Sequence, residues 1–363
     1  MTATTTLVLG TKKGLIALDR GASGWRARPI EHAGIHVSYA FRDPRTDTLW
    51  AALDHGHWGS KLSRSQDGGR TWREAPAPKY PEGATGPCTG KPATLRYVYG
   101  MAHGLPSQKG RLYVGTVPGG LFQSDDDGAS WTLADAFWNH PTRKQWGQGG
   151  KDFDEPGLHS ILVDPRDPRR LVVGSSSAGV LETTDAGASW TPRNKGMLMS
   201  YGPDPHPEVG HDPHLLSACA AEPDVVWQQN HCGVFRSTDS GRTWTDVGQK
   251  GGPVFFGFPV AADAKDPRRA WLVPATSDEK RYAVGGAMCV ARSDDGGKSW
   301  GVFRDGLPQQ DCYDVVYRHG LDVRGDTVVV GSTTGNLWVS DDRGERWRSL
   351  GSSFPPILSV RFA

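Results

Sequence analysis

The chain has 363 residues, with 41 basic and 40 acidic side chains and a formal net charge of +1. This even balance argues against nucleic acid or a membrane surface as a partner, and no apolar run approaches the length of a membrane-spanning helix. Five widely spaced cysteines show neither a disulfide framework nor a Cys-x-x-Cys metal pair, and the stretch from Met1 to Leu9 lacks the basic start and long apolar run of a signal peptide, so a cytoplasmic location is expected.

Short alternating strands are predicted from the N-terminus onward. The first group contains only three strands, at Thr6–Gly10, at Gly14–Leu18 and from Trp25. The second group contains four, which we name A to D in chain order. Its strands are predicted at Ile35–Phe41, Thr48–Leu53, Lys61–Ser65 and from Trp72.

An eight-residue motif, Ser/Thr-x-Asp-x-Gly-x-x-Trp, links strands C and D of each group, and we call it the box. Six boxes occur, at 65–72, 124–131, 183–190, 237–244, 293–300 and 340–347, and Asp19, Gly21 and Trp25 form a degenerate seventh. Asp accepts hydrogen bonds from nearby backbone N–H groups and Gly supplies a positive φ, so each box is predicted to be a hairpin turn. Its Trp is expected to anchor one repeat against the next.

The box tryptophans recur every 47 to 59 residues, a spacing that suits the four-stranded blade of a β-propeller. The first blade lacks a strand A, and the last blade is followed by a spare strand at Ile357–Phe362. This tail is expected to join blade one and close the ring, which removes free sheet edges. The prediction is an all-β, seven-bladed propeller of four-stranded antiparallel blades, forming one domain over residues 1–363.

The boxes resemble the Asp-box (BNR) repeats of sialidase-like β-propellers. That class includes sialidases, xyloglucan hydrolases, sortilin-type receptors and photosystem II assembly factors, and the likeness is greatest to uncharacterised bacterial proteins labelled as glycosyl hydrolases or exo-sialidases. The resemblance covers the whole chain. It implies the propeller fold but no single chemistry, because the class shares the box and not a reaction.

Sialidases carry an arginine triad, a Tyr–Glu nucleophile pair and an acid–base Asp, and their first arginine lies in a Phe-Arg-Ile-Pro motif. The nearest string in this chain is Phe41-Arg-Asp-Pro44, which lies at a predicted A–B turn. That turn is expected on the same face as the boxes, away from the expected site. A sialidase or other glycoside hydrolase therefore ranks third among three interpretations of the function.

The face opposite the boxes is predicted to carry the functional site. The D–A and B–C loops lie there, and four of them are enlarged, at 75–96, 137–157, 194–213 and 276–286. Loops on a rigid scaffold commonly carry function. Nine of the twelve histidines map to these loops or to the start of strand A, at the mouth of the central channel.

These histidines have two interpretations, which the sequence leaves open. In one, several imidazoles bind a divalent transition metal, Zn, Fe or Cu, with an open position for water or substrate. The metal-ligand candidates are His159, His214 and His231, with His36, His55 or His57 across the channel, and the candidate catalytic residues are Glu208, Asp54 and Arg281. In the other interpretation, each histidine is a hydrogen-bonded rim residue.

Further residues in these loops have paired interpretations. Cys232 is either a nucleophile or a small buried residue. Aromatic residues of the loops are expected either to stack on a sugar or to pack the loops as lids; they are Trp58, Trp138, Trp146 and Tyr201.

Two classes of function follow. The first is a soluble bacterial enzyme with a His-rich, metal-dependent site that acts on a small polar molecule or glycan at the channel mouth. The second is a non-catalytic scaffold that presents its loop face to a protein partner. The metal content of the purified protein discriminates between them.

Overall fold

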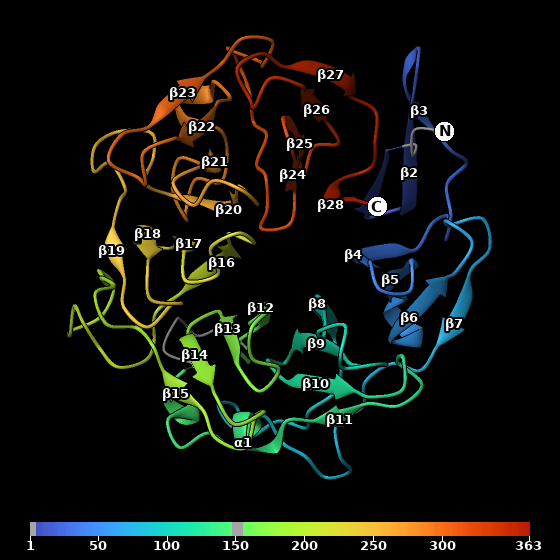
Figure 1. Ribbon diagram of the computed structural model, residues 1–363, viewed down its shortest axis with the longest axis vertical. Coiled ribbons are helices and arrows are strands. Elements are labelled where there is room, and N and C mark those ends of the chain that lie inside the picture. Colours follow the sequence, from blue (N-terminus) through green and yellow to red (C-terminus); the bar gives the residue numbers. More distant parts are fainter. Residues whose placement is uncertain (1–4, 147–154) are drawn as a thin grey trace.

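A computed structural model describes residues 5–146 and 155–363 and contains seven four-stranded antiparallel sheets arranged as a ring (Figure 1). The predicted all-β, seven-bladed propeller is therefore confirmed. The insertion predicted at 137–157 lies partly outside the described residues. Within the described ranges, no helix is long and apolar enough to cross a membrane.

The blades follow the chain order, and the strands of each blade run in order from the innermost to the outermost. Blade one contains β28 (Ile357–Phe362), β1 (Thr6–Thr11), β2 (Gly14–Gly21) and β3 (Gly24–Ala27). Blade two contains β4 (His36–Asp43), β5 (Thr48–Asp54), β6 (Ser60–Ser65) and β7 (Arg73–Ala75). Blade three contains β8 (Tyr97–His103), β9 (Leu112–Val117), β10 (Leu121–Ser124) and β11 (Thr132–Leu133). Blade four contains β12 (Leu158–Val163), β13 (Leu171–Ser175), β14 (Gly179–Thr183) and β15 (Thr191–Pro192).

The remaining blades repeat this order. Blade five contains β16 (Pro213–Ala218), β17 (Val226–Asn230), β18 (Gly233–Ser237) and β19 (Thr245–Asp246). Blade six contains β20 (Gly257–Ala262), β21 (Ala270–Pro274), β22 (Val290–Ser293) and β23 (Gly301–Phe303). Blade seven contains β24 (Leu321–Arg324), β25 (Thr327–Gly331), β26 (Leu337–Ser340) and β27 (Arg348–Gly351). Helical turns in the loops are α1 (Asp135–Trp138) and three 3-10 turns at Gly56–Trp58, Arg143–Gln145 and Val284–Gly286.

The two ends of the described chain meet in blade one. Strand β28 pairs antiparallel with β1, from Leu7 opposite Phe362 to Thr11 opposite Ile357 (Figure 1). Ile357 and Val360 are fully buried in a core shared with Val329 of blade seven. The ring is thus closed by a strand from the far end of the sequence, as the missing strand A predicts.

The boxes form the predicted C–D turns. In the first box, the Oδ1 atom of Asp67 accepts hydrogen bonds from the N–H groups of Arg70 and Thr71, both at 2.9 Å, while Ser65 Oγ accepts one from the Gly69 N–H at 2.9 Å. The outer strand begins one residue after the box Trp, at Arg73. Each turn therefore satisfies its own backbone donors with side-chain oxygens.

Three box tryptophans hydrogen-bond to a neighbouring blade, whereas the indole N–H of Trp72 and of Trp347 donates to a glycine carbonyl of its own box. The indole N–H of Trp244 donates to the Arg193 carbonyl at 2.8 Å, and that of Trp300 donates to the Val247 carbonyl at 2.8 Å. Both carbonyls follow the outermost strand of the preceding blade. These tryptophans therefore contact the preceding blade and not the next one, because their C–D turns lie beside the outer strand of the preceding blade.

Ring closure predicts a stability effect at β28. Replacing Ile357 by Ala removes a fully buried side chain between blades one and seven, and should lower the free energy of unfolding by about 2–5 kcal/mol. Urea denaturation followed by tryptophan fluorescence measures it. The exposed Ser352→Ala change nearby should stay within about 0.5 kcal/mol. An equal effect of the two changes would contradict a closing role for β28.

The box carboxylates predict acid sensitivity. Hydrogen bonds from Ser130 lower the pKa of Asp126 from 3.8 to about 2, and those from Ser189 do the same for Asp185. Because the folded-state pKa is the lower one, the stabilisation is complete above pH 3.8 and is lost as the pH falls towards 2. Denaturation midpoints measured from pH 5 to pH 2 should fall for the native chain and fall less steeply for Asp126→Asn. Parallel curves would contradict this assignment.

Candidate functional site

A pocket of about 610 Å³ opens on the face opposite the boxes. Its lining comes from D–A loops, from B–C loops and from the first residues of innermost strands, in blades three to seven. The D–A loops supply Tyr201 and Asp212, the B–C loops supply His231 and Asp278, and β16 supplies His214. This is the face on which the sequence places the enlarged loops.

Six innermost strands carry a β-bulge near their start. The pairing register shifts at the position of Ser38, Tyr99, His159, His214, Phe258 and Leu358 in the strands β4, β8, β12, β16, β20 and β28 respectively. A bulge takes a residue out of the ladder and re-aims its side chain. Five of these six residues line this pocket or the channel cavity next to it. The bulges therefore supply the inner wall of the site.

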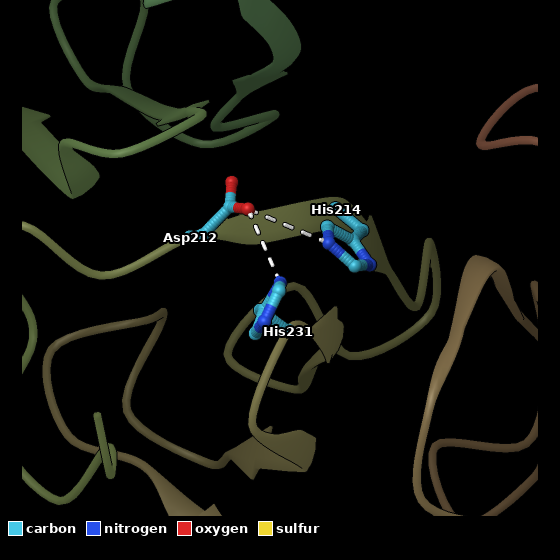
Figure 2. Close-up of side chains that lie close together, drawn as sticks. All are labelled: Asp212, His214 and His231. Atoms are coloured by element: carbon cyan, nitrogen blue, oxygen red, sulfur yellow. Dashed lines mark ion pairs between the residues drawn. The ribbon is translucent and has the colours of Figure 1, made fainter. Parts of the chain in front are cut away.

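Asp212, His214 and His231 converge in this pocket, and Figure 2 shows both imidazoles directed at the carboxylate. The Asp212 Oδ2 atom lies 3.6 Å from His214 Nε2 and 3.7 Å from His231 Nδ1. One ligand atom from each residue lies within 4.8 Å of the other two. The His231 loop is held against this group, since its N–H donates to the Asp212 carbonyl at 2.9 Å.

Hydrogen bonding sets the tautomer of His214. Its Nδ1 atom lies 2.6 Å from the Gly257 carbonyl oxygen, which can only accept, so Nδ1 carries the proton. In the neutral ring Nε2 then presents a lone pair towards Asp212. A backbone carbonyl in this position is the usual partner of a metal-binding imidazole.

The pKa shifts of Asp212 and His214 favour an ionised carboxylate beside a neutral imidazole. Burial lowers the pKa of His214, whose side chain is only 3 % exposed. Burial by itself raises the pKa of Asp212, but the interactions with the neighbouring His214 ring and with the nearby charge of Arg318 outweigh it and hold this pKa well below its usual range. Asp212 is therefore ionised at neutral pH.

Aromatic rings and one more carboxylate surround the group. The ring of His214 stacks on Phe258 with centroids 4.7 Å apart, and Tyr201 meets His231 edge-on at 5.1 Å. The second nitrogen of His231, Nε2, lies 3.4 Å from Asp278 Oδ2. The His231 imidazole thus lies between two carboxylates.

The structure places the other predicted metal ligands elsewhere. His159 is buried, and its Nε2 and Nδ1 atoms contact the Pro213 carbonyl at 2.8 Å and the Ser160 hydroxyl at 2.9 Å. His36 faces Asp54 across 3.5 Å in the channel cavity, while His55 and the exposed His57 lie in the β5–β6 loop. None of these four belongs to the convergent group in the described part of the chain.

The predicted catalytic residues also separate. Arg281 borders both the pocket and the channel cavity, and Asp54 lines the channel cavity alone. Glu208 is exposed, and its backbone carbonyl accepts a hydrogen bond from Asn194 at 2.7 Å. Glu208 does not line the pocket because the 194–213 loop brings Asp212, and not Glu208, to the channel.

Sequence reasoning missed Asp212 and Arg318. Asp212 stands two residues before His214, so a carboxylate immediately before strand A was the available signal.

Cys232 is buried, with its sulfur 3.3 Å from the Ser200 hydroxyl, which is the environment of a packed thiol. Trp138 and Trp146 are buried against Arg143 at 4.6 Å and pack the long loops, whereas Trp58 is 80 % exposed.

The molecule belongs to the class of seven-bladed β-propellers. No family model matches the chain. An oligoxyloglucan-reducing end-specific xyloglucanase of Emericella nidulans is 26 % identical over 215 residues, 56 % of this chain and 23 % of that protein. The chain thus spans about a quarter of that relative's length.

Two solved structures share the fold. The GH74 xyloglucanase of Xanthomonas campestris aligns with a TM-score of 0.66 and 18 % identity over 95 % of this chain and 52 % of its own. YCF48 bound to D1 peptide aligns with a TM-score of 0.51 and 15 % identity, covering 91 % of this chain and 85 % of that one. At these identities the likeness establishes the propeller and nothing finer.

The His214 geometry predicts a measurable tautomer. Because Nδ1 donates to Gly257 and burial keeps the pKa below the ordinary 6.5, the ring should remain neutral and protonated at Nδ1 at pH 7. Long-range ¹H–¹⁵N spectra, assigned by loss of the signal in His214→Gln, report the tautomer directly. A ring protonated at Nε2 would contradict the donation from Nδ1 to the Gly257 carbonyl.

Proposed function

We propose that the protein binds a divalent transition-metal ion through Asp212, His214 and His231 and acts on a small polar molecule or glycan in the pocket. The observation that carries the proposal is the convergence of three ligand atoms within 4.8 Å, with the His214 Nδ1–H already bound to a carbonyl. Metal–ligand bonds of about 2.1 Å place tetrahedral ligand atoms roughly 3.4 Å apart. The two separations from Asp212, 3.6 and 3.7 Å, are close to this distance, and all three ligand atoms lie within 4.8 Å of one another.

The donor set suits several ions. Two imidazoles with one carboxylate bind Zn²⁺ in hydrolytic sites and Fe²⁺ in oxygenases, and imidazole also suits Cu²⁺. Three protein ligands leave a position open towards the pocket. A bound ion there supplies Lewis acidity to an oxygen atom of water or of a ligand.

The chain's own residues have separable roles in this proposal. Asp278 Oδ2 lies 3.4 Å from His231 Nε2 and can accept its proton, which leaves Nδ1 to face the ion, so Asp278 is a positioning residue. Tyr201, Phe256 and Phe258 offer aromatic surface in the pocket. The likeness to xyloglucanases supports a glycan as the ligand, and the pocket volume of about 610 Å³ supports a small one.

A protein-binding scaffold is the second candidate. Trp58 and Tyr313 are 80 % and 66 % exposed, and both lie in loops on the face of the pocket. Exposed aromatic residues are common at protein interfaces. The fold shared with YCF48, which was solved bound to D1 peptide, supports the same function.

Metal binding tests the first candidate. Protein purified without a histidine tag should bind one Zn²⁺ or Fe²⁺ per chain, as measured by elemental analysis and calorimetry. His214→Ala or Asp212→Asn removes a ligand atom and should weaken binding by more than about 100-fold, since changes beyond the ligands alone cost 10–100-fold. His57→Ala is the matched control, because His57 is exposed on the same face and outside the group.

The outcomes divide the two candidates. Loss of metal in His214→Ala with retention in His57→Ala supports the metal site. A native protein that binds none of Zn²⁺, Fe²⁺ or Cu²⁺, or equal losses in both variants, overturns it and leaves the scaffold.

A further inference from the structure

A second cavity, of about 540 Å³, adjoins the pocket along the central channel. The two share a border formed by Arg96, Tyr99, Val117, Arg281 and Arg318. The channel cavity is otherwise lined from blades one, two, three and seven, and its lining includes Lys12, His36 and Tyr317. A molecule in the metal-binding pocket therefore has the channel cavity directly beside it.

The charges of the channel cavity are unbalanced. Among the described residues, its lining brings the basic side chains of Lys12, Arg281 and Arg318 together with one carboxylate, Asp54. Asp54 is already engaged, since its Oδ1 accepts the Gly56 N–H at 3.1 Å and its Oδ2 lies 3.5 Å from His36. The described lining therefore carries more basic than acidic side chains, and Lys12 belongs to this cavity alone.

Arg318 holds a fixed orientation between the cavities. Its guanidinium carbon lies 5.3 Å from the centre of the Tyr99 ring and 5.6 Å from that of Phe258. One terminal nitrogen donates to Ser176 Oγ across 3.4 Å, a long contact, and its buried Nε has no hydrogen-bond partner within the described ranges. Aromatic contacts cover the flat faces of a guanidinium and leave the N–H groups at its edge for an acceptor.

A buried donor without an acceptor is costly, and an arginine fork is matched by an oxyanion. Arg281 reinforces this position, because its guanidinium carbon lies 5.6 Å from the same Phe258 ring and its Nε is held by the Asp278 carbonyl at 2.9 Å. Two guanidinium groups that border both cavities thus lie beside one ring of the pocket.

We infer that the channel cavity is an anion-binding site, which takes the carboxylate or phosphate group of a small molecule against Arg318, Arg281 and Lys12. Its volume suits a single small molecule and not a polymer. Such a ligand extends its uncharged, hydroxylated end towards Asp212 and His214. The anion site does not depend on a metal ion, so failure of the metal test leaves this inference standing.

Calorimetry on metal-free protein at low ionic strength tests the inference with three probes of similar size. D-gluconate carries a carboxylate, D-glucose 6-phosphate carries a phosphate, and D-glucose is neutral. At least one charged sugar should bind at least tenfold more tightly than glucose, and comparison of the two identifies the preferred oxyanion. Equal affinity for all three probes, or no binding of either anion, overturns the inference.

Variants then locate the site. Arg318→Met keeps the bulk of the side chain and should weaken anion binding at least tenfold, with an unfolding temperature that shows the chain is folded. Lys12→Ala should weaken it less, since Lys12 is exposed at the cavity edge. Lys13→Ala is the matched control, because Lys13 is the next residue of the same turn, is exposed and does not line the cavity. Unchanged affinity in Arg318→Met overturns the assignment.

Discussion

Closure of the ring by β28 is the constraint on which the rest of the structure depends. Every blade buries its faces against two neighbours, so an array that lacked one inner strand would expose a sheet edge and part of the core between blades one and seven. The candidate site also requires that β28 closes the ring. Lys12 of blade one and Arg318 before β24 share one cavity because the last strand of the chain brings blades one and seven together.

A second constraint is the β-bulge that is repeated in the innermost strands of the ring. The innermost strands run close to the axis, and a bulge near the start of six of them turns one side chain out of the ladder. These positions hold residues as different as Ser38, Tyr99, His214 and Phe258. The same β-bulge thus presents a different type of side chain in each blade. The site lies where blades four to seven supply an acid, two imidazoles and two arginines.

The two adjoining cavities share their arginines and differ in their other charged residues. Asp212 and Asp278 face the histidines in the pocket, Lys12 lines the channel cavity, and Arg281 and Arg318 border both. Phe258 lines the pocket and contacts His214 and both guanidinium groups. The arrangement suits a ligand that is anionic at one end and hydroxylated at the other.

The sequence alone determined the class of fold, the number of blades, the closing strand and the face that carries the pocket, because boxes and strand patterns are local and repeat along the chain. It also pointed to His214 and His231 as candidates. The sequence could not show that Asp212 joins these two histidines or that His159 instead contacts the Pro213 carbonyl. The direction of each ring depends on the neighbouring blade and on single-residue bulges. Only the tertiary structure brought Arg318, more than 80 residues beyond His231, to the same pocket.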